Sequence, residues 1–105
     1  MSFKFTDANF KEEALQSDIP VMEDFYADWW GPCKMIGPVI EELAAEFEGK
    51  VKIGKVDTDA NRAIAAEYNV MSIPTIVFIK DGKTVDTVVG ALPKATLEAK
   101  LNAML

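Results

Sequence analysis

The only cysteine of this sequence, Cys33, lies in the stretch Trp29-Trp30-Gly31-Pro32-Cys33-Lys34. Pro32 suits the first turn of a helix, because proline has no N–H group and the first N–H groups of a helix have no partner. We therefore predict that a helix begins at Pro32 and that Cys33 lies in its first turn. The positive end of the helix dipole favours a thiolate there, the nucleophilic form of cysteine. A buried, unreactive thiol is the alternative, because a lone cysteine is usually a small apolar core residue.

Two predicted elements hold this stretch in place. The apolar run from Val21 to Tyr26 precedes it and is typical of a strand buried on both faces. After it, apolar residues at helical spacing continue to about Phe47, and Gly49 should end the helix. Pro38 lies inside this helix and should kink it, because its nitrogen cannot donate and its ring clashes with the preceding turn.

The rest of the chain alternates predicted strands with predicted helices. We expect strands at residues 3–5, 51–57, 75–79 and 84–89, a helix at 8–15 capped by Thr6 or Asp7, a short helix ending at Tyr68 and capped by Asp59 or Asn61, and a helix at 94–104. Asp81-Gly82 is a hairpin turn signal between the last two strands. The order β-α-β-α-β-α-β-β-α predicts an α/β fold in one domain, residues 1–105, with a mixed sheet and helices on both faces.

The composition of the chain excludes several classes of function. The 105-residue chain has 17 acidic and 11 basic residues and a formal net charge of −6, which disfavours nucleic acid or a membrane surface as a partner. It has no histidine, so we expect no metal site, no cofactor and no catalysis by a Cys–His or Ser–His pair. We expect neither a membrane-spanning helix nor a signal peptide, because no long apolar run or leader pattern is visible. A single cysteine suits a reducing compartment and predicts a cytoplasmic location.

Residues 24–34 resemble the active-site segment of bacterial-type thioredoxins, whose pattern reads Trp-Cys-Gly-Pro-Cys-Lys. Trp30 stands where that pattern has its first cysteine, the attacking nucleophile, and Cys33 matches the second, resolving cysteine. The resemblance covers essentially the whole chain and implies the thioredoxin fold and the family's activity, protein disulfide reduction. The partners it implies are disulfide-containing proteins and a thioredoxin reductase. We expect a monomer, and a dimer linked through Cys33 only if the sulfur is exposed.

Other positions match the family's pattern as well. Residues 70–75, Val-Met-Ser-Ile-Pro-Thr, resemble its cis-proline loop, which lies beside the active site and offers backbone groups to an extended substrate peptide. Asp24 matches the family's buried aspartate behind the resolving cysteine, Lys55 matches its lysine partner, and Gly90 matches the glycine that lets a substrate chain approach. The residues that the resemblance implies for substrate binding are Trp29, Gly31, Pro32, Ile73, Pro74, Gly90 and Ala91.

Glu23 and Asp24 are adjacent carboxylates in a strand that should be apolar, and their side chains must point to opposite faces of the sheet. For Asp24 the resemblance implies proton transfer to and from Cys33, with a pKa raised by burial. The alternative is a structural ion pair with Lys55. Glu23 departs from the family, which has an apolar residue there. Because a buried carboxylate is costly unless it is paired or protonated, we expect Glu23 to pair with a lysine or to lie at a wetter strand end.

Disulfide exchange needs one thiolate to attack and a second thiol to release the resulting mixed disulfide. With Trp30 in place of the first cysteine, we predict that this chain cannot complete the dithiol cycle. Two alternatives remain. One is a non-catalytic binding module in which Trp30 adds apolar contact area to the groove. The other is a monothiol redox protein in which Cys33 reacts once and is regenerated by an external thiol such as glutathione.

Overall fold

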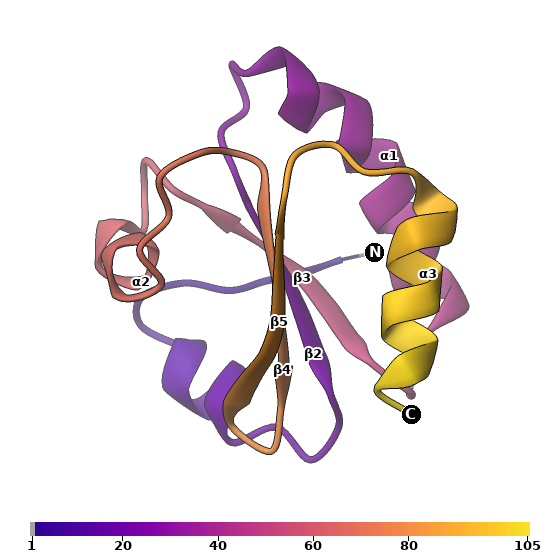
Figure 1. The fold of residues 1–105 in the computed structure, drawn as a ribbon. Coiled ribbons are helices and arrows are strands. Elements are labelled where there is room, and N and C mark those ends of the chain that lie inside the picture. The colour runs from indigo at the N-terminus through magenta and orange to yellow at the C-terminus, as the bar shows by residue number, and fades with distance from the viewer. Residues whose placement is uncertain (1) are drawn as a thin grey trace.

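The computed structural model describes residues 2–105. Figure 1 shows how its helices and strands follow one another. The elements are β1 (Phe3–Lys4), the short π-helix η1 (Lys11–Leu15), β2 (Val21–Tyr26), α1 (Gly31–Glu46), β3 (Lys52–Asp57), α2 (Arg62–Glu67), β4 (Thr75–Lys80), β5 (Lys83–Val89) and α3 (Lys94–Ala103). The predicted order β-α-β-α-β-α-β-β-α is confirmed. Within residues 2–105, no helix is long and apolar enough to cross a lipid bilayer.

The sheet is mixed, as predicted, with the strand order β1-β3-β2-β4-β5. The central strand β2 runs parallel to β3, where Asp24 lies opposite Lys55, and antiparallel to β4, where Asp24 lies opposite Ile76. β4 and β5 form a hairpin through Asp81 and Gly82, both of which have a positive φ. β2 therefore has a partner strand on each side and lies in the middle of the sheet.

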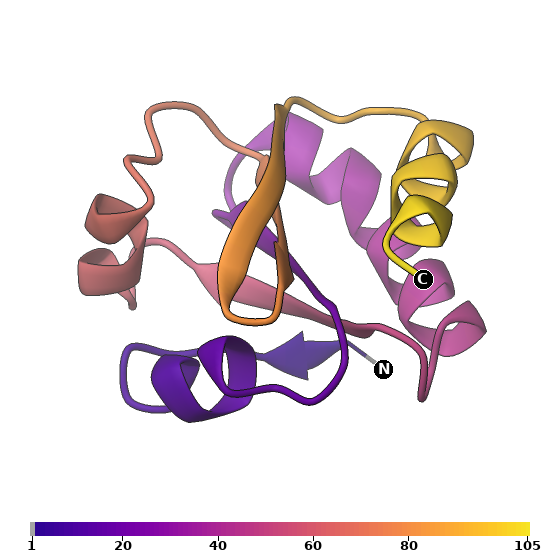
Figure 2. The same cartoon turned by 60° about the horizontal axis from the view of Figure 1, so that its bottom comes forward.

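Helices cover both faces of the sheet (Figures 1 and 2). On one face α1 and α3 enclose an apolar core that includes Met22, Ile40 and Phe78. On the other face η1 and α2 enclose a second core that includes Phe25 and Val77. Since successive side chains of a strand point to opposite faces, Asp24 points with Met22 toward α1, and Glu23 points with Phe25 toward η1 and α2.

The predicted helix at residues 8–15 differs from the observed one. It is a single widened turn, Lys11–Leu15, in which the Gln16 N–H donates to the Lys11 carbonyl at 3.0 Å. This is the i→i+5 bond of a π-helix. Thr6 acts just before it: its hydroxyl accepts from the Asn9 N–H at 3.2 Å, and the Asn9 side chain accepts from the Thr6 N–H at 2.8 Å. A helix is therefore present in the predicted stretch, but it covers only Lys11–Leu15 and is a π-helix instead of a regular α-helix.

Asp7 caps a different helix from the predicted one. Its carboxylate accepts hydrogen bonds from the Ile64 N–H at 3.0 Å and the Ala63 N–H at 3.4 Å, in the first turn of α2. Asn61, at the N-cap position of α2, makes no side-chain cap bond and instead accepts from the Asp7 N–H at 2.9 Å. The prediction that Asp59 or Asn61 caps this helix is therefore wrong, because the N–H groups of its first turn donate to Asp7, which is distant in sequence.

Candidate active site

The loop from β2 to α1 carries the predicted motif. The Trp30 N–H donates to the Ala27 carbonyl at 3.2 Å, which closes a tight turn after the strand. Trp30 is extended, with φ −92° and ψ 126°, and α1 begins at the next residue, Gly31, with Pro32 in the first turn. The Lys34 N–H then donates to the Trp30 carbonyl at 3.2 Å. Cys33 therefore lies in the first helical turn, as predicted, in a helix that begins one residue earlier than expected.

Cys33 lies inside the protein, with 5% of its surface exposed. Burial raises the pKa of its thiol, and the negative charge of Asp24 adds to the rise, whereas a hydrogen bond with the Ala27 backbone only partly opposes it. At this site burial therefore outweighs the effect of the helix dipole, which favours the thiolate. The structure supports the alternative of a buried, protonated thiol.

Asp24 lies under α1 and is completely buried, and within residues 2–105 neither of its carboxyl oxygens has a hydrogen-bond partner. Burial raises its pKa to about 7, although the positive charge of Lys55 acts in the opposite direction. The Lys55 ammonium lies 4.3 Å from the centroid of the Tyr26 ring, and no ion pair joins it to Asp24 in the described chain. The ion-pair alternative is therefore wrong, and Asp24 is a buried acid with a pKa near neutrality.

Glu23 is equally buried on the opposite face of β2, with 0% of its surface exposed. Among the described residues neither of its oxygens has a hydrogen-bond partner, and burial raises its pKa to about 8. The expectation of a lysine partner or a wetter strand end is therefore wrong. The reason is its position in the middle of the central strand, between Gly54 of β3 and Val77 of β4, where no lysine side chain meets it.

An open groove lies beside the motif and has a volume of about 290 Å³. Its lining residues are Trp29, Trp30, Met71, Ser72 and Ile73. Trp29 is 66% exposed and Trp30 is 44% exposed, and their rings meet edge to face with centroids 6.1 Å apart. The Trp29 indole donates to the Asp59 carboxylate at 2.9 Å. Both tryptophans therefore form the rim of a surface groove, and Trp29 is not packed against the sheet.

The loop that carries Pro74 forms the far side of this region. The Ile73–Pro74 peptide bond is cis, and the Pro74 carbonyl accepts from the Gly90 N–H at 2.8 Å. Gly90 has φ +102°, which L side chains rarely adopt, so glycine is required there by its backbone conformation. Ala91 lines a neighbouring cavity of about 180 Å³ with Met35 and other residues of α1. Of the predicted binding residues, Trp29 and Ile73 line the groove and Ala91 lines this second cavity, whereas Gly31, Pro32, Pro74 and Gly90 line neither.

Three residues beside the groove were not among the predicted site residues: Met71, Ser72 and Asp59. Met71 and Ser72 line the groove, and Met71 is 85% exposed. The sequence could have indicated Met71 and Ser72 as groove residues, because they directly precede Ile73 and Pro74 in the same loop. Asp59 follows β3, and β3 ends at the same edge of the sheet as its parallel neighbour β2. That adjacency could have indicated a contact with Trp29.

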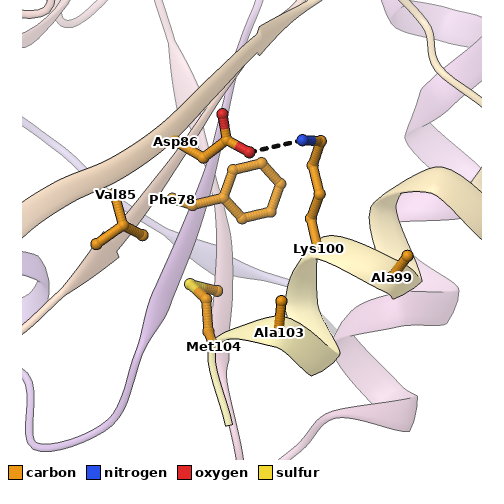
Figure 3. A pocket seen from close by; sticks show the side chains of 7 residues that line it. All are labelled: Phe78, Val85, Asp86, Ala99, Lys100, Ala103 and Met104. Atoms are coloured by element: carbon orange, nitrogen blue, oxygen red, sulfur yellow. Dashed lines mark hydrogen bonds and ion pairs between the residues drawn. The ribbon is translucent and has the colours of Figure 1, made fainter.

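A larger cavity, of about 370 Å³, lies between β5 and α3 (Figure 3). Its floor includes the buried residues Phe78 and Met104, and an ion pair of 2.6 Å joins Asp86 to Lys100 beside it. This ion pair lowers the pKa of Asp86, so the Asp86 carboxylate stays charged and paired with Lys100. None of the predicted site residues lines this cavity, and it has no free reactive group.

The strand order β1-β3-β2-β4-β5 with helices on both faces is that of the thioredoxin fold. A sequence model of the thioredoxin family matches residues 1–103. The thioredoxin of Porphyra purpurea is 53% identical over 97 residues, which cover 92% of this chain and 91% of that protein. Thioredoxin 1 of Nostoc is 51% identical, covering 95% and 94% of the two chains, and the thioredoxin of Haemophilus influenzae is 54% identical, covering 91% and 90%. The chain belongs to the thioredoxin family, whose general activity is protein disulfide reduction.

Proposed function

We propose that this chain keeps a thioredoxin-type groove for disulfide-bearing protein segments but does not complete the dithiol cycle. The observation that carries the proposal is the single thiol: Cys33 is the only cysteine, and Trp30 occupies the position of the attacking one. In the full cycle two protein thiols become a disulfide, and the two electrons and two protons they lose convert the substrate disulfide into two thiols. One sulfur can form only a mixed disulfide, and an external thiol must then release it.

Asp24 is proposed to serve as the acid–base group behind Cys33. A general acid–base group works best when its pKa lies near the working pH, and burial raises the pKa of Asp24 to about 7. Asp24 and Lys55 both influence the pKa of the Cys33 thiol, in opposite directions. This arrangement supports proton exchange with Cys33.

The groove is proposed to hold extended segments of disulfide-containing proteins and of a reductase. The exposed rings of Trp29 and Trp30 offer apolar contact area, and Ile73 lies on the facing loop. This same surface supports the second candidate function, a binding module that holds partners without exchanging bonds. The exposure of Trp30 specifically favours that candidate, because its ring lies at the groove and not in the core.

The monothiol function has less support. An attacking thiol must be accessible and ionised, whereas Cys33 is 5% exposed and has a raised pKa.

The cytoplasmic location stays a prediction, and it rests on the presence of one cysteine in the sequence. The monomeric state also stays a prediction, although the burial of Cys33 argues against a dimer linked through its sulfur.

The deciding experiment compares three chains in the reduction of a fluorescent disulfide peptide driven by dithiothreitol. The unmodified chain and Trp30→Ser, which has cysteine's size without its sulfur, should stay at the background rate. Trp30→Cys should exceed that rate by more than about 100-fold, because its second sulfur makes release intramolecular. Turnover by the unmodified chain at the Trp30→Cys rate would overturn the proposal and establish a monothiol cycle.

A companion measurement separates the binding module from an inert chain. Fluorescence anisotropy would follow the binding of a labelled apolar peptide that contains serine in place of cysteine. The binding module requires saturable binding by the unmodified chain and weaker binding by Trp30→Ser, because the exposed ring is lost. Equal binding by the two chains would remove Trp30 from the binding surface.

A further inference from the structure

Glu23 is a buried carboxylate that the proposed function does not use. Its side chain points into the apolar core between the sheet and the layer formed by η1 and α2, together with Phe25. It is fully buried, and within residues 2–105 both of its oxygens lack a hydrogen-bond partner. An unpaired carboxylate cannot remain charged in such a place without a large cost in free energy. The carboxyl group of Glu23 is therefore protonated in the folded protein.

The titratable groups around Glu23 offer it no compensation. Tyr68, which follows α2, is the group that its charge reaches: burial raises the pKa of Tyr68 to about 12, and the negative charge of Glu23 adds to the rise. Lys52 of β3 and Glu13 of η1 pair with each other at 2.8 Å. Of the other charged residues of the surrounding elements, Lys55, Asp57 and Asp86 are half-buried but share the opposite face of the sheet with Asp24. The rest are exposed at the surface: Lys4, Lys11, Glu12, Arg62, Glu67, Lys80 and Lys83.

We propose that Glu23 is a pH-sensitive switch for the layer formed by η1 and α2. With its proton, the carboxyl group stays covered by this layer. When it loses the proton, the layer moves away from the sheet and water reaches the carboxylate. The inference does not depend on the disulfide chemistry proposed above.

The layer, and not the sheet, is the part that opens. β2 is bonded along its length to β3 on one side and to β4 on the other, whereas η1 has five residues and α2 has six. Short surface elements open at a lower free energy than the whole fold. The layer is attached by the Asp7 cap on α2 and by Tyr68, whose ring centroid lies 5.5 Å from that of Phe10 and 5.7 Å from that of Phe25.

The opening would reach the candidate active site. After α2 the chain passes through Tyr68 and runs into Met71, Ser72 and Ile73, which line the groove. Figures 1 and 2 show α2 on the side of the sheet opposite α1, joined by this loop to β4. Movement of α2 therefore loosens one wall of the groove while α1 and Cys33 stay in place.

The size of the effect follows from linkage. In the closed state the pKa of Glu23 is about 8, and in the open state the side chain regains its ordinary value of 4.5. Between these values the equilibrium constant for opening rises about tenfold per pH unit. From pH 6 to pH 9 the equilibrium constant for opening rises by about 90-fold. The rise levels off above pH 8, because Glu23 then loses its proton in the closed state as well.

The test is hydrogen exchange followed by mass spectrometry on the full chain, with rates divided by their intrinsic values at each pH. Peptides that cover η1 and α2 should lose most of their protection between pH 6 and pH 9, by a factor of up to about 90. Glu23→Gln keeps the shape of the side chain but cannot ionise, so its protection should stay constant. Asp24→Asn is the matched control: it removes the neighbouring carboxylate, keeps Glu23 and should retain the loss.

Three results would overturn the inference. The first is equal loss of protection in the unmodified chain and in Glu23→Gln. The second is protection of η1 and α2 that does not change with pH. The third is a difference between these two chains that is as large in α1 and α3 as in η1 and α2, because that would be global unfolding. If Glu23→Gln does not fold, Glu23→Val takes its place, since it also lacks an ionisable group.

Discussion

Replacing Asp24 by asparagine should stabilise the protein, and the gain should grow with pH. The folded-state pKa of Asp24 is about 7 because the carboxyl group is buried, against 3.8 for an ordinary aspartate. Between these values the folded state binds more protons than the unfolded state, so stability falls as pH rises. The ionisation cost is about 2 kcal/mol at pH 5.5 and about 4 kcal/mol at pH 8.5. Asparagine has no such cost at either pH.

The assay is urea unfolding of the unmodified chain and Asp24→Asn, followed by far-ultraviolet circular dichroism. The difference in unfolding free energy between the two chains should increase by about 2 kcal/mol from pH 5.5 to pH 8.5, which is a shift in midpoint of about 1 M urea. Glu23 titrates in both chains, so its contribution cancels in the difference. Any constant cost of burying the asparagine amide cancels between the two pH values.

A difference that stays flat across this range would refute the reasoning, because Asp24 would then have the same pKa in the folded and unfolded states. A difference that shrinks with pH would show that Lys55 stabilises the charged carboxylate more than burial opposes it. Lys55→Met provides the control. Removing the opposing charge should raise the folded-state pKa of Asp24 further and steepen the loss of stability.

Other substitutions test the packing that holds the site. Asp7→Ala should lower the unfolding free energy by about 1 kcal/mol in urea titrations, because the Ile64 N–H loses its cap; an unchanged midpoint would show that water replaces it. Gly54→Ala should cost at least about 3 kcal/mol or prevent folding, because its Cβ would lie 2.4 Å from the Phe5 ring. Gly37→Ala, where a Cβ meets nothing within 4 Å, should change stability by less than about 1 kcal/mol. Similar losses in the two glycine variants would contradict the packing argument.

The sequence predicted the sheet well because its strands are apolar runs bounded by clear turn signals. Val21 to Tyr26 is followed by a Gly-Pro pair, and Asp81-Gly82 separates the last two strands. The π-helical turn at η1 was not predictable, because one turn is too short for a periodic pattern to distinguish helix types. The cap of α2 was missed for another reason: Asp7 and Ile64 are 57 residues apart and meet only in the folded chain.

The candidate site was likewise predictable in part. The motif around Cys33 and the loop at Pro74 could be located from residue types and spacing. The ionisation of Cys33 could not, because two effects oppose each other there. A helix dipole contributes about 0.3–1 kcal/mol, whereas burying a charge costs several kcal/mol, and only the structure shows that the sulfur is buried. The isolation of Glu23 also depends on which elements cover it, and local sequence does not specify them.

The most direct test of the central claim is the reaction of Cys33 with iodoacetamide, followed by mass across a range of pH, in the native and the urea-unfolded chain. We expect slow modification in the native state and rapid modification only after unfolding, because the sulfur is buried and its pKa is raised. Rapid native modification with a midpoint well below the free-cysteine value of about 8.5 would contradict it. Cys33 would then be an exposed, activated thiolate, and the chain would be capable of monothiol chemistry.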